Sequence, residues 1–143
     1  MGLAIAVFFH AIIFLSLPLK IDLLRRAEGW LDFAQHVQQA RRQTRPDLLI
    51  AGDYAPASIM QFYLPDHPVT YLPPAPYGKT QFTLWPEYEV KPGTHALYVS
   101  AGEKPLPDKV RDEFDQWQKI DDFWSLHRGR PTTHFHIYLL TKS

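Results

Sequence analysis

The stretch "DLLIAGDYAPASIMQFYLP", residues 47–65, decides the fold predicted for this chain. Its first part, residues 47–52, is a short apolar run, which is typical of a strand buried on both faces of a sheet. Asp53 follows at the position of a helix N-cap, and residues 55–63 have the composition of a short apolar helix. Pro65 ends that helix, because proline cannot continue the helical hydrogen bonding. A buried strand that runs directly into a helix predicts an α/β fold.

The flanking sequence extends this unit on both sides. Residues 21–45 repeat apolar side chains at three- and four-residue spacing and end in arginines, which favours a helix that stops before Pro46. "PVTYL" (68–72) and "HALYVS" (95–100) predict two further strands. Residues 65–92 hold seven prolines and are predicted to be mostly irregular.

The C-terminal part predicts a hairpin. Residues 108–117 suit a short charged helix or turn, and "QKIDDFWSLHRGRPTTHFHIYLL" (118–140) reads as two antiparallel strands joined around residues 128–131. The predicted fold class is therefore mixed α/β. We expect a small, partly parallel sheet with a helix on each face and an antiparallel C-terminal hairpin.

Composition excludes several classes of function. Lysine and arginine total 15 and aspartate and glutamate total 15, so no excess positive charge predicts a nucleic-acid partner. The absence of cysteine excludes disulfides, thiolate metal sites and a cysteine nucleophile. There is no glycine-rich phosphate loop, and none of the serines, including Ser58, has a nucleophile-elbow context. No cofactor is predicted.

The N-terminal residues predict a membrane anchor. "GLAIAVFFHAIIFLSLPL" (2–19) carries no charge, and as a helix it would reach about 27 Å, close to the ~30 Å hydrocarbon core of a bilayer. We therefore divide the chain into a transmembrane helix (1–20) and a separate α/β domain (21–143). A signal peptide is disfavoured, because no cation precedes the run and no cleavage motif follows it. Lys20 and the arginines after it would place the domain in the cytoplasm, unless earlier helices set the orientation.

Two sets of residues stand out as candidates for chemistry. Asp53 and Tyr54 lie where a buried strand meets a helix N-terminus, a common location for ligands in α/β sheets, although Asp53 can also be only a cap. His134 and His136 fall on one face of a strand and could bind zinc, with His127 approaching across the hairpin. Because spacing identifies no carboxylate partner, the sequence predicts half-buried or surface histidines and no metal site.

The predicted hairpin carries two adjacent aspartates, which could act as an acid/base pair only if they shared a face. Asp121 and Asp122 should point to opposite faces of a strand, because side chains alternate along it. We therefore expect no shared chemistry between them.

Two motifs carry a resemblance to a known family. Tyr54, Ala57, Ser58 and the run "FYLP" match the pattern Y-x-x-A-S-x-h-x-F-Y-L-P, in which h is apolar, and "TQFTLW" (80–85) is similar to S-Q-Y-D-h-W. In this order, behind an apolar span, they resemble the C-terminal end of bacterial protein-mannosyltransferase-like glycosyltransferases. That group has the GT-C fold and includes the 4-amino-4-deoxy-L-arabinose lipid A transferases.

The resemblance implies a last transmembrane helix followed by an extracytoplasmic α/β domain in the bacterial inner membrane. Family members transfer a sugar from a polyprenyl-phosphate donor, and their catalytic acidic residues lie in an upstream loop that has no counterpart here. The chain would therefore be non-catalytic by itself, and whether it counts as an enzyme stays open. Its partners would be the bilayer and, through the missing membrane part, a polyprenyl-phosphate sugar or a lipid acceptor.

Thr80 and Thr83 replace the serine and aspartate of the second motif, so a polar role at the aspartate position is not carried over. The alternative functions are a free-standing, membrane-anchored binding or interaction domain of the same fold and, less favoured, a zinc enzyme that uses the histidines. The residues predicted to meet a ligand are Asp53, Tyr54, Ser58, Gln81 and Trp85.

Overall fold

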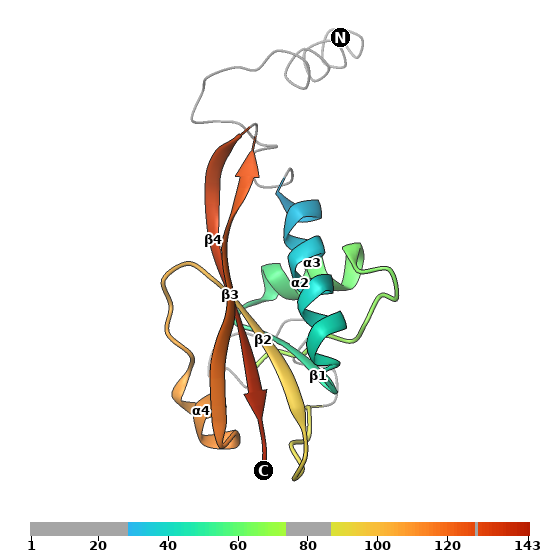
Figure 1. Cartoon of the computed structure of the whole chain (residues 1–143), viewed down its shortest axis with the longest axis vertical. Coiled ribbons are helices and arrows are strands. Elements are labelled where there is room, and N and C mark those ends of the chain that lie inside the picture. Colours follow the sequence, from blue (N-terminus) through green and yellow to red (C-terminus); the bar gives the residue numbers. More distant parts are fainter. Residues whose placement is uncertain (1–28, 74–86, 128) are drawn as a thin grey trace, which may run out of the picture.

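The computed structural model describes residues 29–73, 87–127 and 129–143, which form a four-stranded mixed sheet with helices packed against it (Figure 1). The elements are α2 (Trp30–Thr44), β1 (Leu48–Ala51), α3 (Tyr54–Tyr63), β2 (His95–Ala101), α4 (Asp108–Glu113), β3 (Gln116–His127) and β4 (Arg130–Thr141). The strand order is β1-β2-β4-β3, with β1 parallel to β2 and the other pairs antiparallel. The predicted mixed α/β class is confirmed.

The stretch that decides the fold forms the predicted strand–turn–helix unit. The last three residues of β1 are buried and pair in parallel with β2. Asp53 is extended, and its carboxylate accepts a hydrogen bond from the backbone N–H of Ala55 at 3.0 Å, which caps α3. The helix ends where the N–H of Leu64 bonds the carbonyl of Met60, immediately before Pro65.

The strand predicted at residues 68–72 is wrong apart from one residue. Tyr71 makes a single parallel bridge to Ile50, in which its N–H bonds Leu49 and its carbonyl accepts from Ala51. Residue 73 would donate the next N–H to β1, and because it is a proline the ladder cannot extend beyond the bridge on that side. The helix predicted at 108–117 is also shorter, because Trp117 already belongs to β3.

Alternation along the strands builds two apolar layers. Leu97 and Val99 face α2 and α3, whereas Tyr98 faces α4 and the loop before it, so helices cover both faces of the sheet as predicted (Figure 1). The first layer includes Phe33, Val37, Met60, Phe135 and Ile137. The second includes Ile50, Ala96, Leu106, Val110, Phe114 and Leu140.

The β3–β4 hairpin runs beyond the rest of the sheet, because β2 pairs only with residues 135–141 of β4 (Figure 1). Helix α2 packs against the hairpin where the projecting part begins. The ring of Phe33 lies 4.5 Å from that of Phe135, and Gly29 approaches Ser125 so closely that an added Cβ would lie 2.7 Å from the Ser125 Cβ. A side chain at position 29 would therefore push α2 off the hairpin.

Within the three described ranges, no helix is long and apolar enough to cross a membrane. The transmembrane helix predicted at residues 1–20 lies outside them, as do residues 21–28 of the predicted domain.

Candidate functional site

The first predicted ligand residue, Asp53, has a defined local role as the N-cap of α3. It also borders the buried Tyr98, whose hydroxyl lies so close to Gly52 that a Cβ at that position would be 2.7 Å away. Burial, together with the negative charge of Asp53, raises the pKa of Tyr98 to about 12. Asp53 therefore caps the helix, and its charge adds to the burial that raises the pKa of Tyr98.

Tyr54 and Ser58 line a surface cavity of about 540 Å³ on the outer side of α3. Most of its lining is apolar or aromatic, and Trp30 from the first turn of α2 forms one wall. Gln81 and Trp85, the other predicted ligand residues, lie outside the described residues. The complete cavity lining is Trp30, Tyr54, Ala55, Ser58, Ile59, Phe62 and Tyr63.

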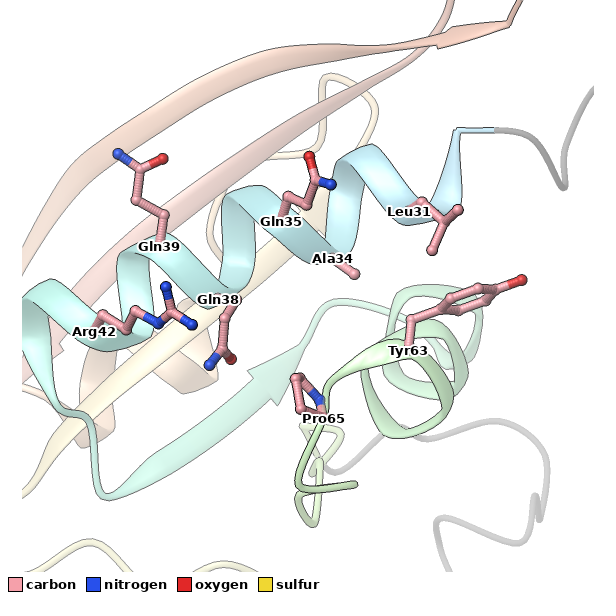
Figure 2. A pocket seen from close by; sticks show the side chains of 8 residues that line it. All are labelled: Leu31, Ala34, Gln35, Gln38, Gln39, Arg42, Tyr63 and Pro65. Atoms are coloured by element: carbon pink, nitrogen blue, oxygen red, sulfur yellow. The ribbon is translucent and has the colours of Figure 1, made fainter.

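A second cavity, of about 410 Å³, lies between α2 and the end of α3 (Figure 2). Gln38 and Arg42 of α2 extend toward Pro65, whereas Tyr63 stands at the other end of the groove (Figure 2). Tyr63 lines both cavities, and the groove beside α2 differs from the first cavity in carrying three glutamines and an arginine along one wall.

The structure also brings together a cluster that sequence spacing did not reveal. His134 and His136 lie on the α4 side of β4, as their alternation predicts, with ring centroids 4.2 Å apart. Their side chains are 16 % and 7 % exposed. Trp124 of β3 stacks on the ring of His134 at 4.5 Å, which fixes the plane of that imidazole.

Two carboxylates complete the cluster from different elements. Asp122 is the β3 partner of His136, and its Oδ2 lies 3.2 Å from Nδ1 of that ring, while its Oδ1 contacts Nε2 of His134. Glu103 follows β2, and its Oε1 lies 2.5 Å from Nδ1 of His134. Gly102 has φ +74° and donates its N–H to the His134 carbonyl, so a left-handed turn places Glu103 over the histidines.

The opposite charges in this cluster stabilise one another and shift the pKa values of His134 and Asp122. Glu103 and, second, Asp122 raise the pKa of His134, because each stabilises the protonated imidazole. Lys119, 2.7 Å from Asp122, and His134 hold the pKa of the Asp122 carboxyl well below its usual range. Without a metal ion, these contacts therefore favour the protonated imidazole of His134, which donates Nδ1–H to Glu103 and Nε2–H to Asp122.

The prediction of no metal site rested on the missing carboxylate partner, and the structure supplies two. Glu103 is 31 residues from His134 in the sequence, so spacing could not identify it. The signal that was present is the Asp121–Asp122 pair on the strand opposite H-x-H. Those two carboxylates do point to opposite faces, as predicted: Asp121 contacts His36 of α2 instead. The side chain of His127 lies outside the described part of the chain.

Comparison of the chain with protein-family models, with curated proteins and with solved structures gave no match. The resemblance to the glycosyltransferases therefore stays a prediction based on the two motifs.

Proposed function

We propose that this chain is the C-terminal extracytoplasmic domain of an integral-membrane glycosyltransferase that uses a polyprenyl-phosphate-linked sugar. In this proposal the domain is not catalytic by itself, and it rests against the bilayer beside the membrane-embedded part. The observation that carries it is an apolar surface, here called the α3 aromatic surface, made of Trp30, Leu31, Tyr54, Phe62 and Tyr63. Three of its side chains are largely exposed: Leu31 (66 %), Tyr54 (62 %) and Phe62 (72 %).

The first family-like motif divides into two halves on α3. Ala57 and Leu64 point inward and are fully buried in the core. Tyr54, Ser58 and Phe62 follow one another at four-residue spacing, so they share the outer face of the helix. Packing explains the inner half of the motif but not the outer half. An outer face with exposed aromatic rings suits a contact that lies outside this domain.

The position of this surface in the chain supports a bilayer as its partner. Trp30 opens α2 and meets Tyr63 edge-to-face, with ring centroids 6.0 Å apart, so the surface begins close to residues 21–28, which connect it to the predicted span. Eight residues can bridge about 28 Å at most, which keeps the surface near the end of the predicted span. Trp and Tyr side chains favour the headgroup layer, where an apolar ring and a polar edge are both accommodated.

The size and location of the native polypeptide test this proposal. An antibody raised against residues 29–143 should detect, in the membrane fraction, a polypeptide well above the 16.6 kDa of this chain. A membrane-bound band at 16.6 kDa would instead support a free-standing, membrane-anchored binding domain. A band found only in the soluble fraction would contradict both functions.

The orientation can be tested separately, because the chain has no cysteine and a single one can be introduced. An environment-sensitive thiol dye on Phe62→Cys should shift to the blue when the full chain enters vesicles of phosphatidylethanolamine and phosphatidylglycerol. The matched control is Lys109→Cys, which is exposed on α4, across the sheet from α3. Equal shifts at both positions, or none at either, would contradict a bilayer contact at the α3 aromatic surface.

A further inference from the structure

We propose that Glu103, His134 and His136 form a Zn²⁺ site and that Asp122 orients both of its imidazoles. The proposal rests on the arrangement of these four side chains and does not depend on the proposed glycosyltransferase function. The potential ligand atoms of Glu103, His134 and His136 all lie within 4.8 Å of one another.

In each histidine, one ring nitrogen faces Glu103 and the other faces Asp122. Nδ1 of His134 and Nε2 of His136 face Glu103, at 2.5 Å from its Oε1 and 4.0 Å from its Oε2. The opposite nitrogens, Nε2 of His134 and Nδ1 of His136, both face the carboxylate of Asp122. Metal-bound histidines almost always donate their second N–H to a carboxylate or carbonyl, and here one aspartate accepts from both.

Little movement is needed to accommodate the ion. Zn–N and Zn–O bonds of about 2.0–2.2 Å in tetrahedral geometry place ligand atoms roughly 3.4 Å apart. The present separations of 2.5 and 4.0 Å lie on either side of that value. Glu103 can adjust, because its side chain is 76 % exposed and sits in a loop, whereas the histidines are held by the sheet.

The residues around the cluster hold its orienting groups in place and leave one coordination position free. Trp124 stacks on His134, and Lys119 fixes Asp122, so the orienting groups are themselves held. Ser100, the β2 partner of His136, is 2 % exposed, and its hydroxyl has no hydrogen-bond partner among the described residues. Three protein ligands leave a fourth position for water or an anion.

The donor set selects among metals. Two imidazoles with one carboxylate suit zinc and similar transition metals, whereas Mg²⁺ and Ca²⁺ prefer sites built only of oxygen. No thiolate competes, because the chain has no cysteine. We therefore expect Zn²⁺ to bind and Mg²⁺ at the same concentration to leave the protein unchanged.

Zn²⁺ titration of the full chain in detergent micelles, after chelator treatment, tests the site. We expect one saturable equivalent at neutral pH. Glu103→Gln removes the exposed ligand without disturbing a buried contact, and His134→Gln removes a nitrogen ligand; each should weaken binding at least tenfold. The matched controls are Glu89→Gln, whose side chain is also 76 % exposed, and His67→Gln, which lies outside the cluster. Neither control should change the affinity.

A variant of Asp122 tests whether this carboxylate orients the two imidazoles for metal binding. Asp122→Asn should weaken Zn²⁺ binding by about 10- to 100-fold while leaving one equivalent bound, as expected for a group that orients the ligands. Circular dichroism of each metal-free variant confirms that it is folded. The proposal is overturned if wild type binds no saturable equivalent, if the Glu103 and His134 variants bind like wild type, or if Mg²⁺ competes equally.

Discussion

The two faces of the β3–β4 hairpin carry similar residues in different surroundings. On the α2 side, Asp121 contacts Nδ1 of His36 at 2.8 Å, and the His36 ring stacks on Phe123 at 3.7 Å. On the α4 side, Asp122 contacts two histidines, and Glu103 approaches the same pair. Each face has histidine–aspartate contacts, but among the described residues only the α4 side brings several donor atoms around a common point. The number of converging donors therefore separates a metal site from a packed histidine.

The largest expected effect lies on the α2 face. Phe33 is fully buried and packs on Phe123 and Phe135, so Phe33→Ala should lower the free energy of unfolding by about 3–5 kcal/mol. Trp124→Ala, on the other face, should cost less than about 1.5 kcal/mol, because Trp124 is 50 % exposed. Chemical denaturation of both variants without metal measures the difference. Equal losses would show that the two faces do not differ as described.

The next largest effect is the stabilisation of the folded protein by Zn²⁺, which should depend on the α4 side of the hairpin and not on the α2 side. At a free Zn²⁺ concentration 100 times the dissociation constant, we expect about 2.7 kcal/mol of added stability. His36→Gln should keep this gain, and His134→Gln should lose it. Thermal denaturation with and without Zn²⁺ measures both. A gain lost in the His36 variant would place the metal on the wrong face.

A smaller effect is expected from the pair on the α2 face. His36→Gln and Asp121→Asn should each cost about 1 kcal/mol, the ordinary contribution of one partly exposed hydrogen bond. Because the two side chains are in contact, the double variant should cost less than the sum of the single variants. A double-mutant cycle by urea denaturation tests this, and strict additivity would show that the contact contributes nothing.

The smallest expected effect is a pH dependence of the stability of the metal-free protein, which arises from the histidine cluster on the α4 side of the hairpin. His134 faces Glu103 and Asp122, with Lys119 beyond, and its pKa is raised above the usual 6.5. Its contribution to stability is therefore complete below about pH 6.5 and is lost as pH rises through the higher folded-state pKa. Asp122 has a lowered pKa, so its contribution is present above about pH 4 and is lost in acid.

The difference in Tm between wild type and His134→Gln, both metal-free, should accordingly be larger at pH 5.5 than at pH 8.5. Zn²⁺ affinity should change in the opposite direction, because protons compete with the metal for the imidazoles. A Tm difference that grows with pH would contradict the protonated state assigned to His134.

The sequence predicted the fold better than the site. Residues 47–65 predicted β1, the Asp53 cap and α3, because a short apolar run, a capping side chain and a terminating proline are all local signals. The strand at 68–72 failed because Pro73 has no N–H to continue the pairing, so Tyr71 makes a single bridge.

The site depends on features that are not local. A β-bulge at Ile120 shifts the register between Lys119 and Asp121, which puts Asp122 rather than Asp121 opposite His136. The turn at Gly102 brings in Glu103 from a different strand connection. The H-x-H pattern could therefore predict that two histidines share a face, but not which carboxylates would meet them.

The most direct test is Zn K-edge X-ray absorption of the full chain loaded with one equivalent of Zn²⁺. We predict two imidazole nitrogens and a carboxylate oxygen at about 2.0–2.2 Å, with one imidazole lost in His134→Gln. A spectrum with oxygen neighbours only, or one unchanged in that variant, would contradict a zinc site on the α4 side of the hairpin.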